Sequence, residues 1–139
     1  METKPTNAQI YWNTLMEIFK EFTFESAHRL PNVPDEHKCS RMHGHSYRVE
    51  IHVAGQIDPI TGWIMDFADI TKAFAPLLGK LDHHVLNEID GLEVPTSENL
   101  SIWIWNHLHD ILPLTCVVVR ETSTSGAIYR GDQSQDTRP

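Results

Sequence analysis

Alternating hydrophobic and polar positions predict strands in both halves of the chain. The segment 46–54 alternates most regularly, so that its hydrophobic residues would share one face of a strand and its polar residues the other. Alternation over the second half of 18–25, the β-branched run 115–122 and the short segment 127–130 are also typical of strands. The pattern therefore predicts four strands, two near each end of the chain.

Helical spacing of hydrophobic positions predicts two helices between the second and third strands. Asp66 is placed to cap a first helix, whose hydrophobic positions run from Phe67 to Leu81. Thr96 or Ser97 is expected to cap a second helix. This order predicts an α+β domain, with a four-stranded antiparallel sheet and both helices on one face. The open edges of such a sheet would favour assembly with other copies.

Length and charge narrow the class of protein. The 139 residues fit one domain, and 19 acidic against 11 basic residues give a net charge of −8. A negative field argues against non-specific nucleic-acid binding. No apolar run reaches the roughly 18 residues of a membrane span, and the polar start lacks the apolar core of a signal peptide. Two cysteines are too few for a secreted disulfide framework, so we expect a cytoplasmic protein.

The two ends of the chain are expected to lie outside this domain. Residues 1–15 are polar and weakly patterned, and are interpreted as an N-terminal extension. Residues 132–139 contain no apolar anchor and are expected to form a flexible tail. The predicted domain is therefore 16–131.

Histidine is unusually frequent, with nine copies in the chain. In an extended segment, His43 and His45 point to the same side, and a hairpin of the first two strands would bring His28 close to them. Three imidazole nitrogens with an open fourth position are typical of catalytic zinc sites. The alternative is three unrelated surface histidines.

Cys39 precedes His43 by four residues and lies beside Lys38 and Arg41. Neighbouring cations favour the reactive thiolate form of a cysteine. The alternatives are a fourth metal ligand, which would make the site closed and structural, or an inert thiol.

Two acidic residues, Asp82 and Glu121, are further candidates for a functional role. Asp82 stands next to His83, and a carboxylate can orient an imidazole and stabilise its charged form; the alternative is the polar end of a helix. Glu121 shares a predicted strand face with Val119, where a carboxylate needs a partner if the face is covered. A ligand with two adjacent N–H donors would satisfy both oxygens of Glu121, whereas the alternative is a strand-end glutamate in solvent.

Six motifs occur in an order that resembles the 6-pyruvoyl-tetrahydropterin synthase family. Each motif alone is weak, but six in sequence are specific, and the resemblance extends from about Glu17 to Gly131. The motifs are Phe24–Leu30, Cys39–His45, Gly62–Phe67, Leu81–Asn87, Pro95–Asn99 and Arg120–Thr122. The resemblance implies a tunnelling fold, in which three subunits close their sheets into a barrel and two trimers form a homohexamer.

The resemblance also implies roles for individual residues. It implies a Zn2+ ion on three histidines, namely His28, His43 and His45. It implies proton transfer by the Cys39 thiol together with Asp82 and His83, across a subunit boundary. The substrate would be a pterin triphosphate, whose ring is implied to bind Glu121 with the help of Thr96, Ser97 and Glu98.

Two details resemble the carboxy branch of this family, which serves queuosine biosynthesis. Only three residues separate Cys39 from His43, and His84 follows the Asp82–His83 pair. The implied reaction converts 7,8-dihydroneopterin triphosphate into 6-carboxy-5,6,7,8-tetrahydropterin, releasing acetaldehyde and triphosphate. The alternatives are the pyruvoyl reaction, which releases triphosphate without acetaldehyde, and a non-catalytic binding module stabilised by zinc.

Overall fold

The computed structural model describes residues 15–132. Apart from Leu15 and Asp132, the predicted extension and tail lie outside the described residues. The longer elements are, in chain order, β1 (Leu15–His28), β2 (His43–Gln56), α2 (Phe67–Leu81), β3 (His84–Val85), α3 (Ser97–Leu108), β4 (Leu114–Thr122) and β5 (Ser125–Tyr129). Two short 3-10 helices, η1 (Lys38–Ser40) and η2 (Leu86–Glu88), lie between them.

The strands form one five-stranded sheet in the order β3-β1-β2-β4-β5. The α+β class and the two helices are confirmed, but the prediction of four antiparallel strands is wrong. The extra strand, β3, pairs parallel to β1 through Ser26↔His84 and Ala27↔Val85, which makes the sheet mixed. It also separates the helices, so that α2 precedes β3 and α3 follows it. A two-residue strand is too short to show alternation, and main-chain pairing alone defines it.

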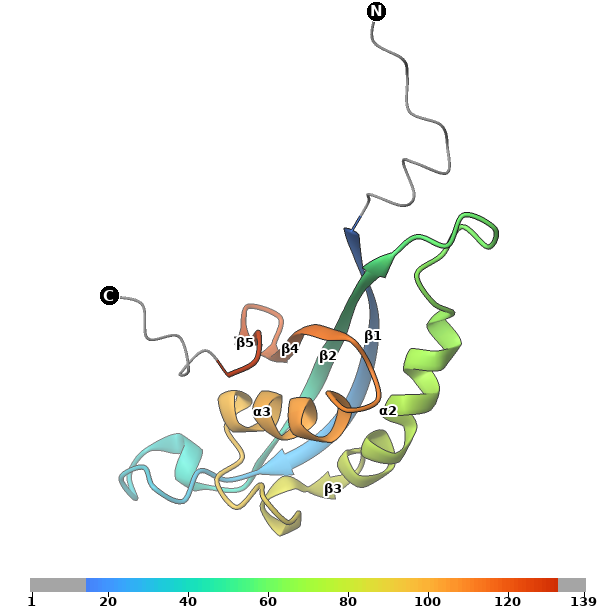
Figure 1. Ribbon diagram of the computed structural model, residues 1–139. Coiled ribbons are helices and arrows are strands. Elements are labelled where there is room, and N and C mark those ends of the chain that lie inside the picture. The colour runs from blue at the N-terminus through green and yellow to red at the C-terminus, as the bar shows by residue number, and fades with distance from the viewer. Residues whose placement is uncertain (1–14, 133–139) are drawn as a thin grey trace, which may run out of the picture.

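Both helices lie on one face of the sheet (Figure 1). Helix α2 packs against β1, and helix α3 packs against β4 and β5. The core lies between these layers and consists of apolar residues from the inner strand faces and from both helices, including Phe24, Val49, Ile51, Phe74, Ile104 and Val119. None of the described helices has the length and apolar character needed to cross a membrane.

Side-chain caps start both helices. The Asp66 carboxylate accepts a hydrogen bond from the Ala68 N–H, as predicted for the first helix. For the second helix the cap is Thr96 rather than Ser97, because the Thr96 hydroxyl accepts from the Asn99 N–H. These caps satisfy main-chain donors that have no partner within a helix.

The β1–β2 hairpin is longer than the sequence pattern predicts. Antiparallel pairing extends from Leu15↔Gln56 to His28↔His43. Beyond Glu25, the polar Ser26 and His28 give no hydrophobic signal of a strand, yet their backbone continues the ladder. The extra residues place His28 opposite His43, at the end of the sheet where the candidate site lies.

Candidate metal centre and active site

Three histidines from two neighbouring strands meet at one end of the helix-covered face. His43 and His45 project from β2 on the same side as Tyr47, and His28 is the last residue of β1. One ligand nitrogen from each ring lies within 4.8 Å of the others. His28 is only 1% exposed, so the cluster lies at the margin of the core rather than on the surface.

Main-chain carbonyls orient two of these rings. His28 Nδ1 lies 2.8 Å from the Pro95 oxygen, and His43 Nδ1 lies 2.7 Å from the Arg41 oxygen. Because a carbonyl can only accept, both rings carry their hydrogen on Nδ1 and present an Nε2 lone pair when neutral. These two Nε2 atoms are 3.0 Å apart.

The third ring, His45, has a buried nitrogen without a hydrogen-bond partner among the described residues, namely Nε2. A buried nitrogen of this kind costs free energy unless another group satisfies it. Burial is the main cause that lowers the pKa of His28 and of His45, and it outweighs the opposite effect of Glu121 on both pKa values. A lowered pKa keeps the rings of His28 and His45 neutral at neutral pH, which is the form that binds metals.

This donor set fits a zinc ion. Catalytic zinc sites use three protein ligands and keep a fourth position open, and imidazole suits zinc well. Carbonyls that fix the tautomer of ligating histidines are the usual outer partners in such sites. The three imidazoles provide the ligand set, and main-chain carbonyls fix the tautomer of two of them, His28 and His43.

Glu121 ends β4 beside two of the histidines. Its Oε1 atom lies 3.4 Å from His28 Nε2 and 3.6 Å from His45 Nε2, and its side chain is 28% exposed. The Glu121 carboxylate is therefore partly buried against the histidine cluster and is not a fully solvated strand end. The alternation in β4 predicted the face of Glu121, but only the pairing of β4 with β2 brings it to the histidines.

Cys39 lies in η1 and is partly buried. The loop that carries it is anchored, because the Cys39 carbonyl accepts from the Leu30 N–H at 2.8 Å. The thiol residue lines a cavity together with Lys38, His43, His45, Glu121, Thr122 and Ser125. Among the described residues, the cluster that could hold a metal consists of the three histidines and does not include Cys39.

Asp82 and His83 are held at the edge of β1. The Asp82 carboxylate accepts from the Glu25 N–H at 3.0 Å, and the His83 N–H donates to the Glu25 carbonyl at 2.6 Å. The Glu25 N–H is the first cause that holds the pKa of Asp82 below its usual value, followed by the hydrogen bond with the His83 ring. His83 Nδ1 lies 3.0 Å from Asp82 Oδ1, and the ring is 78% exposed.

The backbone of His83 has a φ of 59°, which is uncommon for a residue other than glycine. Such conformations persist where surrounding contacts impose them, and they concentrate at functional sites. Here the Asp82 carboxylate and the His83 N–H hold the turn, because both form hydrogen bonds with the main chain of Glu25. His83 therefore sits in a defined position although its ring is exposed.

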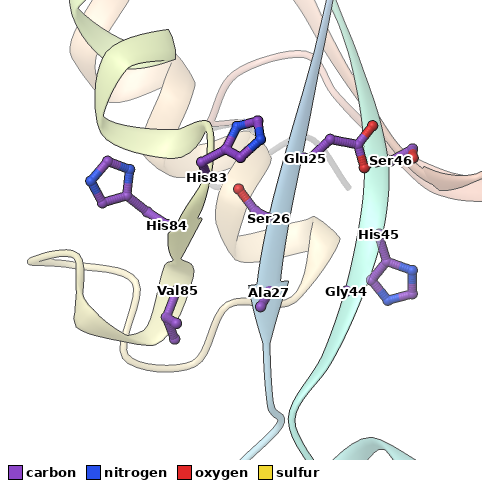
Figure 2. Close-up of a pocket in the computed structure, with 9 residues that line it drawn as sticks. All are labelled: Glu25, Ser26, Ala27, Gly44, His45, Ser46, His83, His84 and Val85. Atoms are coloured by element: carbon purple, nitrogen blue, oxygen red, sulfur yellow. Dashed lines mark hydrogen bonds between the residues drawn. The ribbon is translucent and has the colours of Figure 1, made fainter.

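Within one chain, the structure does not bring Asp82 and His83 to the cavity of Cys39. His83 lines a different cavity, whose other walls include Glu25, Ser46 and His84. Figure 2 shows His83 and His84 to one side of β1, and His45 extending from β2 on the other side. Among the described residues, neither Asp82 nor His83 lines the cavity that contains Cys39.

The predicted pterin-binding residues lie at the start of α3. Ser97 and Glu98 line a further cavity with Glu121, whereas the Thr96 hydroxyl is engaged in the helix cap. Sequence reasoning missed Tyr47, whose hydroxyl lies 3.2 Å from His28 Nδ1, and Ser125, which lines both cavities of Glu121. The alternation of 46–54 placed Tyr47 on the face of His45, and this signal could have found it.

Comparisons with known proteins identify the family to which the chain is similar. Residues 17–132 match the family described as 6-pyruvoyl tetrahydropterin synthase. The chain is 44% identical over 119 residues to a 6-carboxy-5,6,7,8-tetrahydropterin synthase of Synechocystis sp., covering 81% of this chain and 91% of that protein. It is 33% identical over 137 residues to the human 6-pyruvoyl tetrahydrobiopterin synthase, covering 84% of this chain and 92% of that protein.

A comparison with solved structures supports the same family. The structure of the Caenorhabditis elegans 6-pyruvoyl tetrahydropterin synthase superimposes with a TM-score of 0.79 at 26% identity, covering 86% of this chain and 97% of that one. The family match extends over nearly all of the described residues. The chain therefore belongs to the 6-pyruvoyl tetrahydropterin synthase family of enzymes.

Proposed function

We propose that the protein is a zinc-dependent 6-carboxy-5,6,7,8-tetrahydropterin synthase of queuosine biosynthesis. It converts 7,8-dihydroneopterin triphosphate and water into 6-carboxy-5,6,7,8-tetrahydropterin, acetaldehyde and triphosphate. The observation that carries this proposal is the 44% identity to a synthase of that name, which covers 91% of the relative. The low cysteine content supports a cytoplasmic location.

His28, His43 and His45 would hold the zinc ion. A bound zinc would supply Lewis-acid polarisation of the substrate's side-chain oxygens. The chain itself prepares the site, because the carbonyls of Pro95 and Arg41 keep the rings of His28 and His43 in the ligating tautomer.

Cys39 acts as the general base. Its thiolate removes a carbon-bound proton from the substrate side chain, a step for which a positioned base contributes about 10²–10⁴ in rate. The support is the shared cavity, in which Cys39 lies with His43, His45 and the cation Lys38. Its absence from the three-histidine cluster favours an open site over a closed one.

Asp82 and His83 supply the second proton transfer. The Asp82 carboxylate stabilises the charged form of the His83 ring, with which it makes a 3.0 Å contact. Because Cys39 and His83 line different cavities of one chain, we propose that His83 completes the site of a neighbouring subunit. This requires a homo-oligomer, and the proposed state is a hexamer formed by two trimers.

Glu121 anchors the ring of the substrate. Its carboxylate would accept two hydrogen bonds from the adjacent N–H donors of the aminopyrimidine edge, while residues 96–98 line the ring. The support is the cavity that Glu121 shares with Ser97 and Glu98. Charge-assisted hydrogen bonds of this kind contribute about 1.5–3 kcal/mol.

Product analysis tests the proposal. The zinc-loaded protein is incubated with 7,8-dihydroneopterin triphosphate, the pterins are separated by chromatography, and acetaldehyde is measured with alcohol dehydrogenase and NADH. We expect equal amounts of 6-carboxy-5,6,7,8-tetrahydropterin and acetaldehyde. Cys39→Ala, loaded with zinc in the same way, serves as the control and should form neither.

Two other outcomes would replace the proposal. Release of triphosphate without acetaldehyde would assign the pyruvoyl reaction, which the 33% identity to the human synthase keeps as the second candidate. No turnover, together with sulfur coordination in the X-ray absorption spectrum of the zinc, would assign a non-catalytic module.

A further inference from the structure

The position of Glu121 follows from the register of three strands. The pairs Arg48↔Arg120 and Val49↔Val119 align β4 with β2, and the next residue along, Glu121, returns to the helix-covered face. On the other side of β2, the pairs Ser26↔His45 and His28↔His43 align β1. The carboxylate and the histidines therefore project from adjacent strands at the same end of the sheet.

Two distances from Glu121 are close to those between ligands of one metal ion, although the group that could hold the ion consists of the three histidines alone among the described residues. Zinc–ligand bonds of 2.0–2.1 Å in a tetrahedron place neighbouring ligand atoms about 3.3 Å apart. Glu121 Oε1 lies 3.4 Å from His28 Nε2 and 3.6 Å from His45 Nε2. The separation within the histidine pair, 3.0 Å between the Nε2 atoms of His28 and His43, is similar.

These contacts are unfavourable without a cation. The Nε2 atom of neutral His28 is an acceptor, because the ring hydrogen lies on Nδ1 and faces the Pro95 carbonyl. A carboxylate is also an acceptor, so the two atoms repel each other unless a positive charge lies between them. A divalent metal ion between Glu121 and the histidines would supply that charge, and the short distances of Glu121 Oε1 from His28 Nε2 and His45 Nε2 leave it close to both.

We infer that Glu121 is part of the metal centre, and that its carboxylate strengthens the binding of a divalent cation by the three histidines before a pterin occupies the cavity. Glu121 contacts His28 and His45, so it acts from one side of the cluster. This inference rests on the proposed zinc-dependent function and adds a second role to the residue proposed to anchor the pterin.

The test measures zinc affinity in the absence of any pterin. The metal-free full chain is titrated with zinc in competition with a chromophoric chelator. Loss of an outer partner of a metal site typically weakens metal affinity about 10–100-fold, and we expect Glu121→Gln to show this loss. Glu121→Asp keeps the charge but draws it back by one methylene, so its affinity should fall between those of the wild type and of Glu121→Gln.

Glu98→Gln is the matched control. It makes the same chemical change in the cavity that Glu98 shares with Glu121, but Glu98 makes no ion pair with a histidine in the described part of the chain. Its zinc affinity should equal that of the wild type. A loss as large as that of Glu121→Gln would show that the general negative field matters rather than the position of Glu121, and would overturn the inference.

The remaining outcomes separate the inference from the proposed function. Equal zinc affinity in the wild type and Glu121→Gln would overturn the inference and leave the zinc-dependent function in place. No zinc binding by the wild type would overturn both. If circular dichroism shows that Glu121→Gln does not fold, Glu121→Asp decides, since wild-type affinity in that variant would also overturn the inference.

Discussion

The Nε2 atoms of His28 and His43 face each other at 3.0 Å, while the Nδ1 atom of each ring lies within hydrogen-bonding distance of a main-chain carbonyl. Two lone pairs at this separation need a cation between them. The hairpin register and the carbonyls of Pro95 and Arg41 create this arrangement before any metal binds. The following predictions concern zinc binding by the histidines, the Tyr47 hydroxyl, the Cys39 thiol and Asp82 in the turn after α2.

Zinc should stabilise the metal-free protein, and His43→Ala should abolish this effect. A ligand that binds only the native state at a hundred times its dissociation constant stabilises it by about 2.7 kcal/mol. The measurement is thermal unfolding with and without zinc. His52→Ala is the control, because His52 is paired with Glu50 away from the cluster and should leave the shift unchanged. An undiminished shift in His43→Ala would place the zinc elsewhere.

Tyr47→Phe should weaken zinc binding while the fold is kept. The Tyr47 hydroxyl lies 3.2 Å from His28 Nδ1, and its buried ring stacks on Phe24. Phenylalanine preserves the stacking but removes one of the two polar partners of this nitrogen. We expect an affinity about 10-fold lower, measured by chelator competition. Tyr129→Phe, a change of the same kind beside Trp105, should leave the affinity unchanged.

An unchanged zinc affinity in Tyr47→Phe would contradict this role of the hydroxyl. It would show that the Pro95 carbonyl alone holds the His28 ring.

Cys39→Ala should retain zinc and lose turnover by about 10²–10⁴-fold. This result would identify the Cys39 thiol as a base rather than a zinc ligand. It is expected because, among the described residues, the cluster that could hold a metal contains only the three histidines. Zinc content is measured by atomic absorption, and turnover by product formation. Cys116→Ala is the control, because Cys116 is buried in β4 and burial raises the pKa of its thiol.

Loss of zinc from folded Cys39→Ala would contradict the catalytic role. In that case the thiol is the fourth ligand, and the non-catalytic zinc module becomes the better interpretation.

Asp82→Asn should reduce the loss of stability in acid. The Glu25 N–H and the His83 ring hold the pKa of Asp82 below its usual value of 3.8 in the folded chain. A carboxylate with a lowered folded pKa contributes stability above its unfolded pKa, and this contribution disappears as the pH falls through the folded pKa. Between pH 5 and pH 2, urea unfolding should therefore show a steeper decline for the wild type than for Asp82→Asn. Parallel declines would show that the contact with Glu25 does not stabilise the charged form.

Local patterns determined the elements that depend on residues close together in the chain. The cap at Asp66, a second cap at Thr96 or Ser97 and the spacing of the two helices were predicted because capping and helical periodicity involve neighbours within a few positions; the structure selects Thr96. The same holds for His43 and His45, since alternation in an extended segment places them on one side. The order of motifs also identified the family, because six short signals in sequence rarely occur together by chance.

Strand ends and the extra strand were decided by main-chain pairing. β1 continues to His28 and β3 forms at His84–Val85 because their backbone groups find partners on a neighbouring strand. This pairing is nearly independent of side-chain type, so hydrophobic alternation does not report it. The predicted four-stranded sheet was wrong for this reason.

The composition of the site was decided by contacts between distant parts of the chain. Glu121 reaches His28 only because β4 and β1 both pair with β2, in a register set by the whole buried sheet. Likewise, the contacts of Asp82 and His83 with Glu25 hold this pair at the outer edge of β1 and apart from the cavity of Cys39. The sequence alone determined which chemical groups the chain carries. The tertiary structure decided which of them meet, because strand register joins residues that no local pattern connects.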